Sequence, residues 1–399
     1  MRSLTSQHHF RVRLSSKATE LFVTLIFLIS VLWFNQLVYA GDQPVCEYDE
    51  ASGRITITAS GQWGGILRRN ASSIIFKRGH TAKFQNYDGA TVDNTERVVW
   101  EDQSIEGGAS LWIDQSGGPF APGRTDEKGL SEIEFAVDME GGTNPVDGPW
   151  DLSVSGTDTS DTIIGGTRGL KLNGDGDLDV KARGHVDGYS ISAGDGDDSV
   201  FMDGRSGTGH FSLKNAPSTL VTGERGSDRL VGGPGDDSLL GRVGKDWLVG
   251  RRGRDALEGS LGSDELIGGL DKDYRILGGG GRDLIEGGPG NEYHLEGGDG
   301  SDVIKAGSDR DRVYGQAGDD RLLGQGSMDS LFGGEGDDHV IAGKGRDEVR
   351  GEPGDDHLEG SAGNDLIFGH EGDDHLDGDA GNDSCNPGTG HNTKEDCES

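Results

Sequence analysis

The sequence predicts an all-β protein, a right-handed parallel β-helix whose short strands follow one another in regular coils. Three observations carry this prediction. Glycine supplies 72 of the 399 residues, whereas hydrophobic residues make up 31% and aromatic residues 6%. Short stretches of alternating apolar and polar residues recur between acidic, glycine-rich turns, and none has the apolar stripe of an amphipathic helix. From Gly223 onward the spacing of these stretches becomes nearly constant.

The composition also excludes several classes of protein. The chain has 37 Lys and Arg against 71 Asp and Glu, for a formal net charge of −34. A nucleic-acid partner is not expected, because phosphate neutralisation needs clustered cations. The apolar residues are too few for one large core of ordinary composition, and 10 prolines without a Gly-x-y triplet exclude collagen. Disorder remains, or a repeat fold that a cation completes.

Residues 1–40 have the order of an export signal. Basic residues precede the apolar stretch Leu21–Phe34, and small Ala40 follows, so cleavage is expected after Ala40. The alternative is an uncleaved anchor, since Leu21–Val38 nearly reaches spanning length. Both alternatives place the remaining chain outside the cytoplasm, secreted or at the cell surface. After cleavage, no stable membrane insertion is expected.

The next two regions are expected to be β-rich but less regular. Residues 41–150 contain alternating stretches such as Arg54–Thr58 without a fixed period. In residues 151–222 the strands recur about every 20 residues, which suits degenerate coils of a parallel β-helix. The expected strands there are Leu152–Val154, Leu170–Leu172 and Tyr189–Ile191.

Residues 223–384 form a nearly exact repeat of nine residues. An acid recurs at this spacing from Asp228 to Asp383, with an aliphatic residue two positions later in most copies. Two steps are ten residues long, after Asp273 and after Glu292. These insertions are one double repeat apart, so we expect them to stack as a bulge on one side.

The unit Gly-Gly-x-Gly-x-Asp-x-aliphatic-x, as in Gly232–Leu239, resembles the hemolysin-type calcium-binding repeat of RTX proteins. About eighteen copies cover the region. The resemblance implies a calcium-bound parallel β-roll in which two repeats make one coil, so the predicted β-helix would continue into this roll. A C-terminal export signal, which many RTX proteins carry, is replaced here by the N-terminal pattern.

The residue types fit several bound Ca²⁺ ions. Glycines allow a tight loop to direct carbonyl oxygens inward, and each acid adds a carboxylate to an all-oxygen site, which favours Ca²⁺ over Zn²⁺ or Cu²⁺. Stacked coils would bring like charges to strand spacing, so we expect the array to fold when it binds Ca²⁺. Sites around Asp273, Glu292, Asp311 and Asp329 depart from the pattern and are doubtful. The predicted metal ligands are Asp198, Asp228, Asp237, Asp246, Asp255, Asp264, Asp283, Asp302, Asp320, Asp338, Asp347, Asp356, Asp365, Asp374 and Asp383.

Residues 385–399 are expected to cap the array. Cys385 and Cys397 enclose a short loop in an exported chain, which favours a disulfide, whereas Cys46 has no evident partner. Three histidines, His339, His357 and His375, each follow a repeat acid and are 18 residues apart. They should form an outward ladder with about 5 Å between rings. A polar, solvated face is the favoured interpretation, with a transition-metal site as the alternative.

The sequence contains no nucleophile elbow, P-loop or zincin motif, and the first hypothesis is a secreted, non-enzymatic calcium-binding repeat protein. A second is a hydrolase or polysaccharide-acting enzyme with its site in residues 41–222, for which a groove containing Trp100, Trp112 and Trp150 would argue. A third is a calcium-dependent adhesin or surface-layer component with a cell-surface or glycan partner.

Overall fold

The computed structural model describes the backbone of the strands from Val45 onward. It describes side chains at residues 152–156, 160–166, 170–171, 188–204, 216–292 and 294–398. The chain divides into two units, Met1–Gln43 and Pro44–Ser399. The first unit, which includes the predicted export signal, lies outside the described residues. No described residue belongs to a helix, so the described part of the chain contains no helical segment of the kind that spans a membrane.

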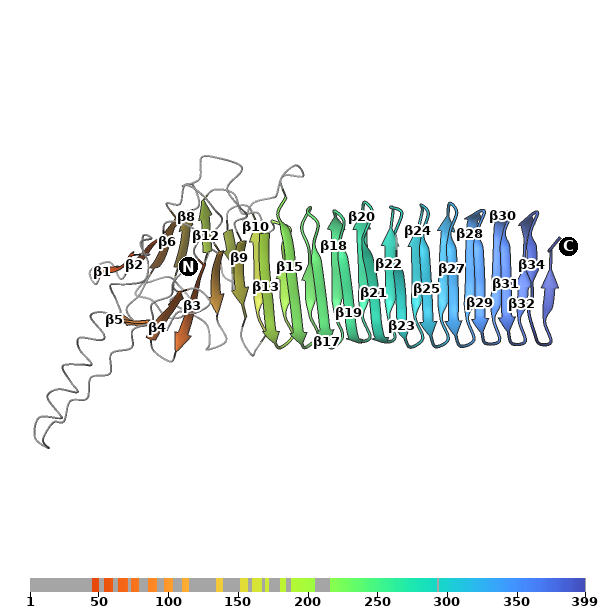
Figure 1. The fold of residues 1–399 in the computed structure, drawn as a ribbon, viewed down its shortest axis with the longest axis horizontal. Coiled ribbons are helices and arrows are strands. Elements are labelled where there is room, and N and C mark those ends of the chain that lie inside the picture. Colours follow the sequence, from red (N-terminus) through yellow and green to blue (C-terminus); the bar gives the residue numbers. More distant parts are fainter. Residues whose placement is uncertain are drawn as a thin grey trace, which may run out of the picture. The chain divides into compact units, whose positions relative to one another are not determined.

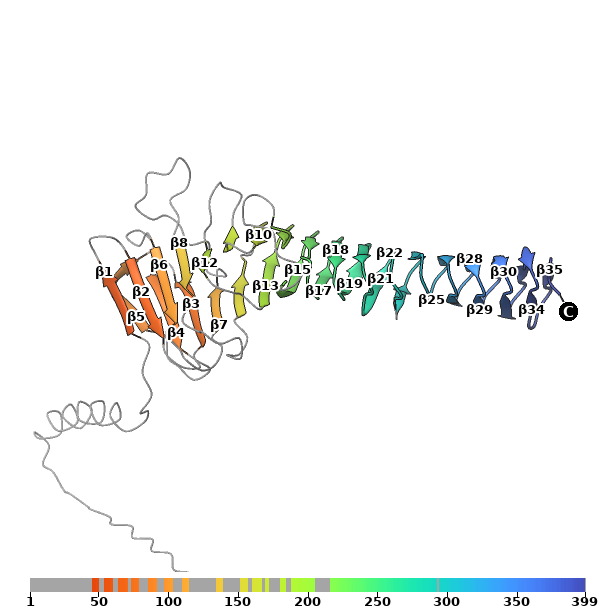
Figure 2. The same cartoon turned by 90° about the horizontal axis from the view of Figure 1, so that it is seen from above.

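The second unit is an all-β solenoid built from two sheets, whose strands alternate along the chain from Gly188 to Asp377 (Figures 1 and 2). Sheet A contains β1 (Val45–Asp49), β2 (Arg54–Ala59), β6 (Arg97–Asp102), β8 (Glu134–Asp138), β10 (Thr162–Gly166), β11 (Gly169–Lys171), β12 (Val180–Arg183), β14 (Ser199–Phe201), β16 (Arg229–Val231), β18 (Trp247–Arg252), β20 (Glu265–Leu270), β22 (Leu284–Gly288), β24 (Val303–Gly307), β26 (Arg321–Gly326), β28 (His339–Gly345), β30 (His357–Gly363), β32 (His375–Asp377), β33 (Ala380–Gly381) and β35 (Thr393–Glu395).

Sheet B contains β3 (Gly64–Asn70), β4 (Ser73–Arg78), β5 (Gln85–Thr91), β7 (Ser110–Asp114), β9 (Asp151–Ser155), β13 (Gly188–Asp195), β15 (Ser218–Arg225), β17 (Ser238–Val243), β19 (Ala256–Gly262), β21 (Arg275–Gly281), β23 (Leu295–Asp299), β25 (Arg312–Ala317), β27 (Ser330–Glu335), β29 (Glu348–Pro353), β31 (Leu366–Glu371) and β34 (Ser384–Asn386).

In the repeat array, one turn of the solenoid contains one strand of each sheet. Each strand pairs in parallel with the equivalent strand of the next turn. Leu230 of β16 pairs with Leu248 of β18, and Leu239 of β17 pairs with Leu257 of β19. The turns follow one another in this way for about ten turns (Figure 1). Two nine-residue repeats therefore make one turn, and the predicted parallel solenoid is confirmed.

The core is a file of aliphatic side chains between the two sheets, to which each sheet contributes one row. Along β18, for example, Leu248 is fully buried while Trp247 and Val249 are only partly buried, as the alternation of a strand requires. The same position in the neighbouring strands supplies Leu239, Leu257, Leu266, Ile276, Ile285, Leu295, Ile304, Val313, Leu322, Leu331, Val340, Val349, Leu358, Ile367 and Leu376, all fully buried.

The ten-residue steps lengthen two turns without breaking the stack. Ala256 pairs with Arg275, and Ile276 pairs with Leu295, so these turns contain 19 residues. The first extra residue, Tyr274, is 58% exposed; the corresponding Tyr293 lies outside the described residues. The insertion thus leaves the file of core aliphatics in register and places the extra side chain outside.

The turns before the array are longer and carry insertions. Asp151 of β9 pairs with Gly188 of β13, which in turn pairs with Ser218 of β15. Parallel pairing therefore runs without a break past residues 150 and 222, where the sequence suggested changes of character. A strand is present at the position expected from Leu170–Leu172, but its expected place in a parallel coil is wrong, because β11 pairs antiparallel with both β10 and β12. The chain therefore leaves the regular coil at this point and forms short antiparallel strands, which can be joined by short connections.

The last turn is closed by β34 and β35, which pair with β31 and β32. Cys385 in β34 and Cys397 form a disulfide with 5.8 Å between their Cα atoms. This covalent link joins the final strand of sheet B to the segment that follows the final strand of sheet A.

Candidate calcium-binding columns

The repeat acids form two columns, one at each edge of the solenoid where the chain passes from one sheet to the other. Each of these carboxylates is at most 3% exposed. Column 1 contains Asp198, Asp228, Asp246, Asp264, Asp283, Asp302, Asp320, Asp338, Asp356 and Asp374, and column 2 contains Asp237, Asp255, Asp273, Glu292, Asp311, Asp329, Asp347, Asp365 and Asp383. All fifteen ligands predicted from the sequence lie in these columns.

One carboxylate oxygen of each Asp ties its turn to the turn before. The backbone N–H of Asp228 donates to Oδ1 of Asp246 at 2.8 Å, and the N–H of Asp246 donates to Oδ1 of Asp264 at 2.8 Å. Column 2 repeats the arrangement, for example from the Asp347 N–H to Oδ1 of Asp365 at 2.8 Å. These bonds fix the carboxylates at strand spacing and leave the second oxygen of each to be accounted for.

The second oxygen, Oδ2, is buried and has no hydrogen-bond partner in almost every member of the columns. In Asp237, at the start of column 2, it instead accepts the Gly233 N–H at 2.7 Å. An ionised carboxylate that is buried and only half satisfied costs several kcal/mol unless a cation or a proton neutralises it. The unpartnered oxygens belong to Asp198, Asp228, Asp246, Asp255, Asp264, Asp273, Asp283, Asp302, Asp311, Asp320, Asp329, Asp338, Asp347, Asp356, Asp365, Asp374 and Asp383.

Most of the unpartnered oxygens lie beside the first glycine of their repeat, whereas Asp198, Asp311 and Asp347 have the buried alanines Ala193, Ala306 and Ala342 at that position. A Cβ placed on Gly278, the first glycine of its repeat, would be 2.5 Å from Oδ2 of Asp283 and 2.5 Å from the carbonyl oxygen of Gly297. On Gly259 the corresponding distances are 2.5 Å to Oδ2 of Asp264 and 2.6 Å to the Gly278 carbonyl oxygen. Carboxylate and carbonyl oxygens therefore converge on one point from adjacent turns. Such a hard, all-oxygen donor set suits Ca²⁺, whose ligands lie at about 2.3–2.6 Å.

Burial raises the pKa of several column acids far above the ordinary value for Asp. The pKa rises to about 7 for Asp264 and Asp356 and to about 8 for Asp255 and Asp338, with desolvation as the largest cause and neighbouring column acids adding to it. The backbone N–H bonds oppose the rise. Without a cation, column acids such as Asp255 and Asp338 therefore hold protons at neutral pH, and a cation that binds there must displace them.

The doubtful positions behave in two ways. Asp273, Asp311 and Asp329 occupy the same place as the other column acids, with Oδ2 unpartnered. Glu292 differs, since both of its carboxylate oxygens are buried without a partner, and burial together with the Asp311 carboxyl raises its pKa. A hollow of about 360 Å³ beside Glu292 is also lined by Lys272 and Arg310. This segment of column 2 therefore differs from the other repeats in two ways: it has a longer acid, and two cationic side chains line the hollow beside that acid.

The ends of the columns are completed by residues that the repeat pattern did not reveal. The Asp374 N–H donates to Oδ1 of Asn392 at 2.6 Å, and the Asp383 N–H donates to Oε2 of Glu398. These two side chains take the place of the next column acid in each row. The spacing could have indicated Asn392, which lies 18 residues after Asp374. Its side chain is an amide, so it does not match the repeat of acids.

A second, exposed row of acids accompanies column 1 in its later turns. The N–H of Asp337 donates to Oδ1 of Asp319, and those of Asp355 and Asp373 donate to the preceding acid at 2.9 and 2.7 Å. These residues precede the column acids Asp320, Asp338, Asp356 and Asp374 by one position. They add negative charge beside the column. Their backbone N–H groups donate to the acid of the preceding turn, whereas the N–H groups of the column acids donate to the acid of the following turn.

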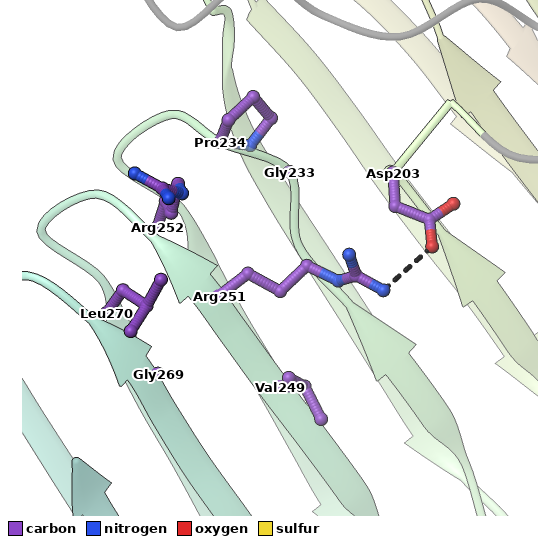
Figure 3. Close-up of a pocket in the computed structure, with 8 residues that line it drawn as sticks. All are labelled: Asp203, Gly233, Pro234, Val249, Arg251, Arg252, Gly269 and Leu270. Atoms are coloured by element: carbon purple, nitrogen blue, oxygen red, sulfur yellow. Dashed lines mark hydrogen bonds and ion pairs between the residues drawn. The ribbon is translucent and has the colours of Figure 1, made fainter.

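A separate hollow of about 500 Å³ lies near the first turns of the array (Figure 3). It is lined by Val249, Leu270 and Pro234, and Arg251 crosses it to bond Asp203 at 2.9 Å. This hollow shares no carboxylate with the columns. The tryptophans considered for an enzyme, Trp100, Trp112 and Trp150, lie outside the residues whose side chains are described.

The nonapeptide array matches a known family. The model described as RTX calcium-binding nonapeptide repeat (4 copies) matches residues 222–257, 240–274, 275–293, 296–327, 323–358 and 350–385. The chain therefore carries RTX calcium-binding repeats across residues 222–385, within a parallel β-solenoid. A comparison of the chain with curated proteins finds no match.

Proposed function

We propose that the chain is an exported calcium-binding protein whose repeat array folds when Ca²⁺ fills the two columns, and that it acts as a non-enzymatic scaffold or surface protein. The observation that carries the proposal is the row of buried, unpartnered Oδ2 atoms, most of which face a carbonyl oxygen of the next turn. The fifteen predicted Asp ligands and the remaining column acids would hold the ions.

Calcium supplies what the metal-free array lacks. The core contributes one aliphatic side chain per strand, while every turn buries two carboxylates. Ions that bind only the folded columns stabilise them by mass action, and because the columns do not exist in the unfolded chain, binding and folding become one process. The basic and apolar order of residues 1–40 supports export, and extracellular calcium sites commonly bind in the range of 10⁻⁴–10⁻³ M.

Circular dichroism of the full chain tests this coupling. In EDTA we expect a spectrum of unordered chain, with β signal restored by millimolar Ca²⁺ and not by the same concentration of Mg²⁺, which prefers octahedral, hydrated sites. Equilibrium dialysis should show many ions bound per chain over the same concentrations. A β spectrum that persists unchanged in EDTA would contradict the proposal. A hydrolase screen on glycans and esters tests the non-enzymatic part separately, and turnover there would refute that part alone.

A further inference from the structure

A cluster of nitrogen and oxygen ligands lies on the outer face of sheet A, in strands that begin directly after the column 1 acids Asp338 and Asp356. His339 begins β28 and His357 begins β30, and the two residues pair directly across adjacent turns. Glu359 follows His357 by two positions, so it projects from the same face of β30. The ring centroids of His339 and His357 are 4.9 Å apart, and those of His357 and His375 are 4.8 Å apart, which agrees with the ladder expected from the sequence.

Glu359 joins the two imidazoles. Its Oε1 atom lies 3.0 Å from Nε2 of His357 and 3.7 Å from Nε2 of His339, and one ligand atom from each of the three residues lies within 4.8 Å of the others. The His339 Nε2 atom is shielded from solvent and has no hydrogen-bond partner. Ligands of a tetrahedral Zn²⁺ ion at 2.0–2.1 Å are separated by about 3.3 Å. The two distances from Glu359 Oε1 to the imidazole nitrogens bracket this value.

We propose that His339, His357 and Glu359 form a site for a borderline transition-metal ion such as Zn²⁺ or Co²⁺, distinct from the calcium columns. Two imidazoles and one carboxylate suit Zn²⁺, whereas Ca²⁺ requires an all-oxygen shell of six to eight ligands. Three protein ligands leave a fourth position open to water or to a group from a partner. The ion would also link β28 to β30 across one turn.

Arg321 opposes the ion. Its Nη1 atom lies 2.9 Å from Nδ1 of His339, and because a guanidinium only donates, Nδ1 accepts and the proton of the neutral ring resides on Nε2. Metal binding at Nε2 therefore requires the proton to leave that atom and Arg321 to turn away. The acid Asp377, which pairs with Glu359 in the next strand, adds a compensating negative charge on the same face.

The test uses tag-free full-length protein in millimolar Ca²⁺, so that the columns are saturated, and titrates it with Co²⁺ and with Zn²⁺. We expect one Co²⁺ per chain with the visible absorption of a tetrahedral nitrogen-containing site, displaced by one Zn²⁺. His357→Gln should weaken Zn²⁺ binding by more than the roughly 10–100-fold that loss of an outer-shell partner costs. Arg321→Gln should strengthen it, because this change frees Nδ1 and removes a positive charge.

His370→Gln is the matched control, since His370 lies on β31 of sheet B and has no part in the cluster; its Zn²⁺ affinity should equal that of the wild type. The cluster side chains are 30–43% exposed, so the variants should fold, which an unchanged dichroism spectrum in Ca²⁺ verifies. The proposal is overturned if the double variant H339Q/H357Q keeps the Co²⁺ spectrum and the Zn²⁺ affinity, or if the wild-type chain retains no Zn²⁺ once Ca²⁺ is saturating.

Discussion

Replacing Gly278 with alanine should remove a calcium site without changing any charge. The added Cβ would lie 2.5 Å from Oδ2 of Asp283 and 2.5 Å from the Gly297 carbonyl oxygen, which is the distance at which Ca²⁺ itself binds oxygen. In this repeat the methyl group would crowd both oxygens. Ala193, Ala306 and Ala342 occupy the equivalent position in three other repeats, so the test concerns the Gly278 repeat alone. Gly278 does not have a positive φ, so the substitution has no backbone strain that would confuse the result.

The size of the effect follows from mass action. An ion held only by the folded chain contributes RT ln(1 + [Ca²⁺]/Kd), which is about 1.4 kcal/mol when calcium is at ten times Kd. Loss of one site should thus lower the free energy of unfolding in Ca²⁺ by about 1.4 kcal/mol, plus a steric term from the close oxygens that is the same with and without calcium.

Gly280→Ala is the control, because Gly280 lies two residues away in the same strand, β21, and its added Cβ would meet only Leu261 Cδ2 at 3.5 Å and Ser260 O at 3.9 Å. Equilibrium dialysis should show at least one ion fewer for Gly278→Ala and the wild-type number for Gly280→Ala. Calcium-dependent melting should separate the two variants in the same order. An unchanged ion count for folded Gly278→Ala would refute the assignment of the calcium position.

Three further predictions concern the column acids, the core and the C-terminal link. In EDTA, lowering the pH from 8 to 5 should increase the β signal. The folded-state pKa of column acids such as Asp338, about 8, exceeds the unfolded value near 3.9, so the folded form gains stability as it takes up protons. A calcium-free spectrum that loses β signal on acidification would contradict this. Leu248→Ala, which empties a fully buried position, should cost about 2–5 kcal/mol by chemical denaturation in Ca²⁺, whereas Leu261→Ala, at a position 62% exposed, should stay within about 0.5 kcal/mol of the wild type; equal losses would mean that the file of aliphatics is not the core. Reducing Cys385–Cys397, which closes a 12-residue separation, should destabilise the last turn by about 3 kcal/mol at most, seen as faster hydrogen exchange in β34 and β35 with β18 unaffected.

Much of the array could be predicted because each repeat position has one physical role. The nine-residue period fixed which residue is buried, as with Leu248, and which carboxylate reaches the turn edge, as with Asp246. The ten-residue steps also behaved as insertions, with Tyr274 placed outside the stack. A strictly periodic sequence leaves one register in which every aliphatic faces inward, since a slip by one residue would expose them all.

The remaining features depend on contacts between turns that no single repeat contains. The sequence predicts a coil strand at Leu170–Leu172, but the strand there pairs antiparallel within an insertion, and an insertion has no period to reveal it. The period also does not show that Asn392 and Glu398 complete the columns, because their side chains differ from Asp while their backbone positions correspond. The sequence analysis also did not identify Glu359 as a partner of the histidines. The histidine ladder joins residues 18 positions apart in neighbouring strands, whereas Glu359 lies two positions after His357 in the same strand.

The two oxygens of each column carboxylate contact different turns, and this explains why the array should fold as a unit. Oδ1 accepts a backbone N–H from the previous turn, as from Asp228 to Asp246, so a turn orders the carboxylate only when its neighbour is already stacked. Oδ2 then meets the carbonyl oxygen of the following turn, as Asp246 Oδ2 and the Gly259 carbonyl do beside Gly241. Each candidate ion position therefore needs adjacent turns in register, and each filled position favours the next one. In a solenoid whose turns contact only their neighbours, calcium binding along the columns should consequently be cooperative, and a break such as the Glu292 segment is where that cooperativity would weaken first.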